Sequence, residues 1–558
     1  MLKLSSICLA TLLVLHTPFS VAETRPVSAM ADSALAASID AGIARYFKAD
    51  EPGATVIVLK DGKPVFRKAY GMADVTKGVT MTPDMSLRLG SITKQFTAVA
   101  ILMLVEEGKL AVSDDITKFF PDYPVKGKKI SIEHLLTHTS GIVSYTGKPD
   151  FRAQSTKDVT VAQMIDYFKN DPLEFEPGTR YRYNNSAYFL LGAVIEKLSG
   201  MPYAKFVEQR IFVPLGMTQS AYEGYERTPT TRALGHTRNE KGFAAASQLS
   251  MSQPYAAGSL VSTVDDLARW DAAISQGKLL KAASWKQAFT AYKLADGKST
   301  DYGYGWDIGT LQGAPSIAHG GGINGFSTFA IRLPEQKVYV AVLTNSESGI
   351  TPASLVATKA AGAAIGKPFP DPTPVKLTAS QLDTYSGSYK VDEKTTYVVR
   401  RDNDNLVMQR PGRRPLTLQP SSDGAFFENS INRFEFARGA TGEVNQVTAL
   451  SESAPLVYQR SGPAPKEAEL AKISHADFDK WAGRYQLMPA MVLEISRDGD
   501  RYFGQATGQP KIEVFPLSDT LFLVKAIDGK IQFGKAADGK DQLVLTQGGR
   551  DLTAPRLP

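Results

Sequence analysis

The chain has 558 residues, of which 43% are apolar, so it is long enough for about three domains of ordinary size. Its formal net charge of +6 is spread too thinly over this length to indicate a nucleic-acid-binding protein. Its single cysteine, Cys8, lies within the first 22 residues, so the rest of the chain has no disulfide and no cysteine-based metal site.

The first 22 residues have the character of a secretory signal peptide. Lys3 gives a positive start, residues 7–19 form an apolar stretch, and residues 20–22 (SVA) resemble a cleavage site. We therefore expect a periplasmic or secreted protein, cut before Glu23. No later apolar run approaches the roughly 20 residues that a spanning helix needs, so we expect no stable membrane insertion.

Residues 54–70, ATVIVLKDGKPVFRKAY, predict an antiparallel hairpin. Two extended apolar runs flank Asp61 and Gly62, and Asp-Gly is a strong signal for a tight hairpin turn. An antiparallel sheet therefore begins near the start of the chain.

Residues 88–108, RLGSITKQFTAVAILMLVEEG, predict a helix that is apolar around nearly its whole circumference and therefore buried. Ser91 and Lys94 stand at its start and share one face. A buried ammonium must be paired or lose its proton, which suits a catalytic base, and a serine becomes nucleophilic when a base removes its proton. The pattern alone also allows a capping serine followed by a lysine that reaches water. A second Ser-x-x-Lys, Ser275 to Lys278, lies at a predicted helix end and is interpreted as accidental.

His134 and His138 are four residues apart and could share one face of a helix. Neither an HExxH arrangement nor a third ligand accompanies them, so we expect no metal and no other cofactor. His138 lies in LLTHTSGI, residues 135–142, which we expect to order a turn near the site.

Residues 176–200, EPGTRYRYNNSAYFLLGAVIEKLSG, place Tyr183 and Asn185 in an irregular segment before an apolar helix. In an extended segment these two side chains point to the same side and can face one site. The alternative is a buried tyrosine with a satisfied hydroxyl beside a helix-capping asparagine.

Residues 317–331, IAHGGGINGFSTFAI, place His319 before three glycines and an apolar run. Such glycines allow a substrate backbone to approach closely, so Gly321 and Gly322 are candidate substrate-binding residues. A glycine-rich turn with an incidental histidine is the alternative.

Residues 337–345, KVYVAVLTN, predict another strand, and a helix follows from about Pro352 to Ile365. Sheet at both ends with helices between indicates an α/β unit whose sheet is closed by strands far apart in sequence. The proline-rich residues 367–376, which follow this helix, predict an extended linker.

The remaining chain predicts antiparallel β-structure and contains an internal repeat. LDTYSGSY at 382 matches FDKWAGRY at 478, and RRDNDNLVMQ at 400 matches SRDGDRYFGQ at 496 at the same offset. We expect two copies of one β-module, residues 377–462 and 470–558, with hairpin turns at Asn403 and Gly499.

Five segments in this order resemble the serine β-lactamase and penicillin-recognising enzyme family, in its class C-like branch of D-aminopeptidases, DD-peptidases and esterases. They are GSITKQFTA, LLTHTSGI, YNN, AAGSLVSTVDDLARW and HGGG. The likeness spans about residues 35–366, and it implies a β-lactamase/transpeptidase-like fold for residues 23–366, an antiparallel sheet flanked by helices with a helical subdomain. The tail resembles the small lipocalin-like barrels that follow this domain in some relatives.

The resemblance implies a role for each candidate residue. Ser91 is the acylated nucleophile, Lys94 and Tyr183 share the proton transfer, and Asn185 orients the substrate. The backbone N–H groups of Ser91 and Gly322 would form an oxyanion hole. His319 is a further candidate, for proton transfer or substrate contact.

The expected function is a metal-independent hydrolase that forms an acyl-serine on D-amino-acid-containing peptides or related amides. A carboxylesterase and a weak β-lactamase are alternatives, and a non-catalytic protein that binds cell-wall fragments is an alternative of another class. True β-lactamases more often carry lysine where this chain has His319. Since a mostly neutral imidazole anchors a carboxylate more weakly than an ammonium does, we do not expect efficient antibiotic hydrolysis. The expected partner is therefore a small molecule or short peptide.

Overall fold

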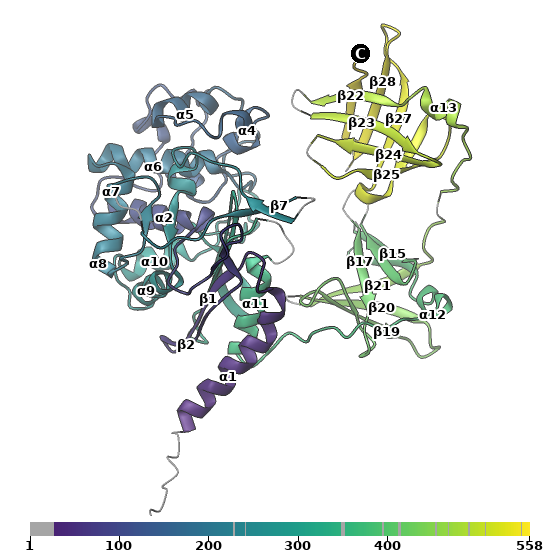
Figure 1. The fold of residues 1–558 in the computed structure, drawn as a ribbon. Coiled ribbons are helices and arrows are strands. Elements are labelled where there is room, and N and C mark those ends of the chain that lie inside the picture. The colour runs from purple at the N-terminus through teal and green to yellow at the C-terminus, as the bar shows by residue number, and fades with distance from the viewer. Residues whose placement is uncertain are drawn as a thin grey trace, which may run out of the picture.

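The computed structural model in Figure 1 describes residues 27–226, 229–239, 242–347, 352–392, 395–410, 415–451, 455–466, 468–488, 491–507, 509–547 and 550–558. The predicted signal peptide, residues 1–22, with Cys8, lies outside these ranges. Within them, no helix combines the length and the apolar character that crossing a membrane requires.

A six-stranded antiparallel sheet forms the centre of the first domain. In sheet order its strands are β10 (Asp307–Leu311), β11 (Ala314–Ile323), β12 (Phe326–Leu333), β13 (Val338–Thr344), β1 (Ala54–Lys60) and β2 (Lys63–Tyr70). The predicted hairpin is confirmed: β1 and β2 are joined through Asp61 and Gly62, whose φ angles are 50° and 73°. As predicted, strands that are far apart in sequence complete the sheet, because β1 pairs with β13 from the other end of the domain.

Helices cover both faces of this sheet. On one face α1 (Val27–Ile43) packs on α11 (Ala353–Ala364), which lies on β12 and β13. On the other face α9 (Val264–Ser275) packs on β1 and β13. Each face has its own apolar core, because the side chains of β1 alternate between the two, Val56 facing α11 and Ile57 the larger core.

The larger core surrounds α2 (Thr93–Glu106), which is buried from Thr93 to Leu104 as its apolar sequence predicts. Helix α6 (Asn185–Ser199) packs against it. The remaining helices of this region are α3 (Ile132–Leu136), α4 (Phe151–Gln154), α5 (Val161–Lys169), α7 (Tyr203–Val207), α8 (Val213–Leu215) and α10 (Ala282–Ala288).

Short strands pair outside the main sheet. They are β3 (Met72–Asp74) with β4 (Val79–Thr80), β9 (Leu260–Ser262) between β5 (Leu87–Arg88) and β6 (Ala221–Tyr222), and β7 (His236–Asn239) with β8 (Gly242–Ala245). Strand β5 leads directly into the segment that carries Ser91, so its pairing with β9 fixes where that segment begins.

The tail forms two eight-stranded antiparallel barrels, which Figure 1 shows as separate bodies beside the α/β domain. After α12 (Ala379–Asp383), the first contains β14 (Gly387–Lys390), β15 (Thr396–Asp402), β16 (Asn405–Gln409), β17 (Leu416–Pro420), β18 (Phe426–Phe427), β19 (Arg433–Arg438), β20 (Val444–Leu450) and β21 (Leu456–Gly462). After α13 (His475–Asp479), the second contains β22 (Gly483–Met488), β23 (Met491–Asp498), β24 (Arg501–Ala506), β25 (Ile512–Pro516), β26 (Leu521–Val524), β27 (Gly529–Lys535), β28 (Asp541–Gln547) and β29 (Arg550–Pro555).

The repeat predicted from sequence is confirmed by matching contacts in the two barrels. The Tyr389 hydroxyl donates to the Tyr385 carbonyl at 2.7 Å, and the Tyr485 hydroxyl donates to the Trp481 carbonyl at the same distance. Both barrels bury an apolar core of their own, so the inner face of each is occupied by side chains.

Candidate active site

Lys94 is fully buried, and its side-chain nitrogen has three oxygen neighbours. Its Nζ lies 3.0 Å from Ser91 Oγ, 2.8 Å from Asn185 Oδ1 and 2.9 Å from the Ala257 carbonyl oxygen. No carboxylate pairs with Lys94 among the residues that the structure describes, and burial lowers the pKa of its amine well below the ordinary value. The lysine therefore does not reach water, which removes the alternative of a lysine at the surface.

These neighbours suit a neutral amine. The Asn185 oxygen and the Ala257 carbonyl can only accept hydrogen bonds, so they take the two N–H bonds of an uncharged lysine. Its lone pair then points to Ser91 Oγ, the one neighbour that can donate. This is the arrangement of a general base beside a nucleophile.

Ser91 is held by the segment before α2. It lies in a 3-10 turn, Gly90–Ile92, and its hydroxyl caps no helix, so the alternative role as a cap does not apply. The Leu89 carbonyl accepts a hydrogen bond from the Thr328 hydroxyl on β12 at 2.7 Å, and the Leu89 N–H donates to Leu260 on β9 at 2.8 Å. The turn is thus fastened between two strands.

Tyr183 lies beside this pair. Lys94 Nζ is 4.7 Å from the centre of its ring, and its hydroxyl lies near Ser91. Burial raises the pKa of the Tyr183 phenol, so the hydroxyl keeps its proton at neutral pH. Asn185, the first residue of α6, also donates from Nδ2 to the Thr146 hydroxyl at 3.1 Å. Structure brings Ser91, Lys94, Tyr183 and Asn185 together.

His319 lies behind Tyr183 and does not line the pocket in front of Ser91. The His319 side chain is buried, and its ring centre is 6.0 Å from that of Tyr183. Nδ1 is 2.6 Å from the Gly320 carbonyl, to which it must donate, so Nε2 accepts from the Tyr302 hydroxyl at 2.8 Å. Burial, with Lys94 nearby, lowers the pKa of the His319 imidazole to about 3. The ring is neutral and both its nitrogens are engaged.

The three glycines after His319 lie within strand β11 rather than in a turn. A Cβ on Gly321 would lie 2.0 Å from the Leu89 carbonyl oxygen, so only glycine lets β11 approach the Ser91 turn this closely. A Cβ on Gly90, whose φ is +53°, would lie 3.0 Å from the Gly322 nitrogen, while a Cβ on Gly322 would meet no neighbour. Strand β10 pairs with β11 only as far as Ala318. The edge of β11 at the three glycines is therefore not paired with β10.

His138 is buried behind Tyr183 with its ring centre 4.2 Å from that of the tyrosine. Its Nδ1 accepts the Asn184 N–H at 3.1 Å, and its own backbone has a φ of +59°. Burial lowers the pKa of the imidazole. His138 thus orders the chain next to Tyr183. His134 instead belongs to the cap of α3, where its Nδ1 accepts the Ser131 N–H.

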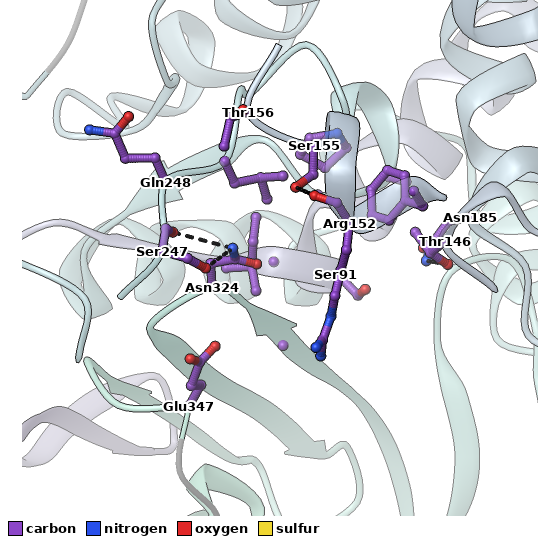
Figure 2. Close-up of a pocket in the computed structure, with 18 of the residues that line it drawn as sticks. Ser91, Thr146, Arg152, Ser155, Thr156, Asn185, Ser247, Gln248, Asn324 and Glu347 are labelled. Carbon is purple, nitrogen blue, oxygen red and sulfur yellow. Dashed lines mark hydrogen bonds between the residues drawn. The ribbon is translucent and has the colours of Figure 1, made fainter. Parts of the chain in front are cut away.

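A cavity of about 740 Å³ opens in front of Ser91. Ser91 and Asn185, which Figure 2 labels, line it together with Gly322. Its charged lining residues are Arg152 from α4 and Glu347 from the segment after β13, within the described part of the chain. Neither residue was predicted from the sequence, because each stands in a short segment without a motif. Ala257 was also missed, since its contribution is a backbone carbonyl that every residue carries.

The family model named Beta-lactamase matches residues 35–365, nearly the span of the resemblance read from the five motifs. The chain belongs to the beta-lactamase family. Penicillin-binding protein 4* of Bacillus subtilis (strain 168) is 29% identical over 412 residues, which are 69% of this chain and 90% of that protein.

Solved structures of this beta-lactamase family are also similar. The octameric penicillin-binding protein homologue from Pyrococcus abyssi has a TM-score of 0.54 and 26% identity, covering 76% of this chain and 99% of that one. The D-amino acid amidase from Ochrobactrum anthropi SV3, in complex with L-phenylalanine amide, has a TM-score of 0.51 and 25% identity over 60% of this chain and 97% of that one. The family contains penicillin-binding proteins and amide hydrolases, and in this member Ser91 and Asn185 of the Ser-Lys-Tyr-Asn cluster line the pocket.

Proposed function

We propose that this protein is a serine hydrolase that forms an acyl-enzyme on Ser91 and cleaves D-amino-acid-containing peptides or amides. The observation that carries the proposal is the hydrogen-bond set of Lys94, which leaves a lone pair directed at Ser91. A protein that only binds cell-wall fragments would have no use for a buried, unpaired lysine, whose burial costs stability.

In acylation, the Ser91 oxygen attacks the substrate carbonyl while its proton moves to Lys94 Nζ, 3.0 Å away. The N–H groups of Ser91 and Gly322 would hold the negative oxygen of the tetrahedral intermediate. Removal of one such donor typically costs about 10²–10³ in rate. The Tyr183 hydroxyl, protonated because its pKa is raised, gives its proton to the leaving amine and recovers one from Lys94.

In deacylation, the neutral Lys94 accepts a proton from water as the water attacks the ester carbonyl. When the tetrahedral intermediate collapses, that proton returns to Ser91 Oγ and the acid product leaves. The low pKa of Lys94 and the high pKa of Tyr183 thus separate the base from the acid.

The substrate class is supported by the likeness to the enzyme named D-amino acid amidase and to penicillin-binding proteins. A neutral His319 with both nitrogens engaged supplies no permanent cation at the position where β-lactamases more often carry lysine, which argues against efficient antibiotic hydrolysis. From the predicted leader, we also propose that the protein acts in the periplasm or outside the cell.

Intact-mass measurement tests this proposal. The protein is incubated with p-nitrophenyl esters, D-aminoacyl amides and a penicillin, and we expect the mass of the acyl group to be added to the wild type. Ser91→Ala should abolish this adduct with little loss of stability, since the hydroxyl caps no helix.

Ser275→Ala, in the second Ser-x-x-Lys, is the matched control and should keep the adduct. Acylation of Ser91→Ala would refute the assignment of the nucleophile. Complete absence of labelling of the wild type would favour the binding protein, and turnover of esters but not of D-aminoacyl amides would favour the carboxylesterase.

A further inference from the structure

Among the described residues, the lining of the pocket in front of Ser91 has one cationic and one anionic side chain and is otherwise uncharged. Arg152 comes from α4 and Glu347 from the segment that follows β13. Among the described residues neither forms an ion pair, although many other arginines of the chain do. Two opposite charges that face one cavity without pairing are available to a ligand.

Arg152 is exposed, and Figure 2 shows its side chain extending from helix α4 into the space beside Ser91. The Ser155 hydroxyl donates to the Arg152 carbonyl at 2.9 Å, which closes the end of this short helix. No hydrogen bond joins the guanidinium to the described part of the chain, so it is available for the bidentate contact with a carboxylate that its planar geometry allows.

Glu347 lies on the sheet side of the same pocket (Figure 2). Its backbone N–H donates to the His236 carbonyl at 3.2 Å, and its Oε2 accepts the Gly325 N–H at 3.1 Å. These contacts hold the carboxylate at the rim of the pocket, where it can accept hydrogen bonds from an ammonium group.

The two other basic side chains near the site, Lys94 and His319, cannot bind a substrate carboxylate in place of Arg152. All three positions around Lys94 Nζ are occupied by protein oxygens, and its base role requires it to be neutral. His319 is neutral, buried and engaged at both nitrogens. A substrate carboxylate that enters this pocket therefore finds its cation on α4.

We propose that the pocket selects short free peptides as zwitterions, in which Arg152 binds the carboxylate and Glu347 binds the ammonium group. This inference rests on the proposed function, because it names the substrate class of the same site. A cavity of about 740 Å³ lies within the range of small-ligand pockets and accommodates a peptide of a few residues.

The test measures competitive inhibition of p-nitrophenyl ester hydrolysis, so that binding is observed whether or not the peptide is cleaved. The inhibitors are D,D-dipeptides of alanine, leucine and phenylalanine, each as the free dipeptide, the C-terminal amide and the N-acetyl derivative. We expect the free dipeptide of at least one series to bind about tenfold more tightly than both capped forms, since each cap removes one charge-assisted contact.

Two variants assign the two charges. Arg152→Gln should reduce the preference for the free dipeptide over its amide, and Glu347→Gln should reduce the preference over its N-acetyl form, each by about fivefold or more. Arg152→Lys keeps the charge and should retain most of the first preference. Lys157→Gln removes a neighbouring cation that does not line the pocket and should change neither ratio.

Equal inhibition by free and capped peptides in all three series would overturn the inference, and so would unchanged ratios in Arg152→Gln or Glu347→Gln. Either result obtained with a wild type that hydrolyses the ester through Ser91 would leave the proposed function standing. Failure of the proposed function would appear separately, as absence of ester hydrolysis.

Discussion

At the scale of single residues, Lys94 illustrates the conflict between stability and chemistry. An ammonium in this position is fully desolvated and has no carboxylate partner among the described residues, so the folded protein favours the neutral amine. The sequence predicted this conflict because a lysine stood at the start of an almost wholly apolar helix. The contact with Ala257 could not be predicted, since it depends on a backbone 163 residues away.

Lys94→Met should stabilise the protein in a pH-dependent way. The pKa of Lys94 is lowered in the folded state, while the unfolded chain keeps the ordinary value of about 10.4, so between these values the unfolded state binds one more proton. Wild-type stability therefore rises with pH in this window, by up to about 1.4 kcal/mol per pH unit, and methionine removes the dependence. Urea unfolding should show a larger stability gain at pH 6 than at pH 9. Equal gains at both values would contradict a neutral lysine in the folded state.

His319 was expected from the sequence to transfer protons or to contact the substrate, and the structure supports a positioning role behind Tyr183. His319→Lys would bury an ammonium between the Tyr302 hydroxyl and the Gly320 carbonyl. We expect a loss of about 2 kcal/mol or more in the free energy of unfolding, and no tighter inhibition by a penicillin.

His319→Gln is the control for this change, because its amide oxygen can still accept the hydrogen bond from Tyr302, so it should lose less stability. Tighter penicillin binding by His319→Lys would show that this side chain reaches the substrate after all.

At the scale of elements, the approach of β11 to the Ser91 turn positions the site. Sequence analysis left a glycine-rich turn as an alternative for residues 320–322, because local composition does not distinguish a turn from a strand that another backbone approaches closely. The decisive contact comes from the Leu89 carbonyl, more than 200 residues away in sequence, so no local pattern reveals it.

Gly321→Ala and Gly320→Ala form a matched pair that tests this approach. A Cβ on Gly321 would lie 2.0 Å from the Leu89 oxygen, whereas one on Gly320 would lie 3.4 Å from the Phe329 ring, an ordinary contact. Gly321→Ala should cost about 1–3 kcal/mol of stability and lower kcat by about 100-fold, since it moves Ser91 relative to Gly322. Gly320→Ala should change stability much less. Calorimetry and ester kinetics on both proteins measure the difference, and an active, stable Gly321→Ala would refute the proposed close approach.

At the scale of the whole molecule, the barrels were predictable and their attachment was not. The repeat was visible in sequence because each copy has the same buried tyrosine, Tyr389 or Tyr485. Its hydroxyl hydrogen-bonds the backbone at the beginning of the barrel. The linker showed only prolines and no apolar periodicity. In the structure its Asp371 forms ion pairs with Arg45 and Lys359, which fasten the linker to the side of the α/β domain covered by α1 and α11.

Asp371→Asn tests how firmly this attachment is coupled to the α/β domain. Only 3% of the Lys359 side chain is exposed, so removal of its carboxylate partner leaves a buried charge and should cost about 2 kcal/mol or more in unfolding free energy. The double variant Asp371→Asn with Lys359→Met removes the stranded charge and should be more stable than Asp371→Asn alone. Urea unfolding followed by tryptophan fluorescence measures this, because Trp270, Trp285 and Trp306 are all buried in the α/β domain. If the double variant is instead less stable than Asp371→Asn, then the buried stem of Lys359, and not its ion pair with the linker, supplies the stabilisation.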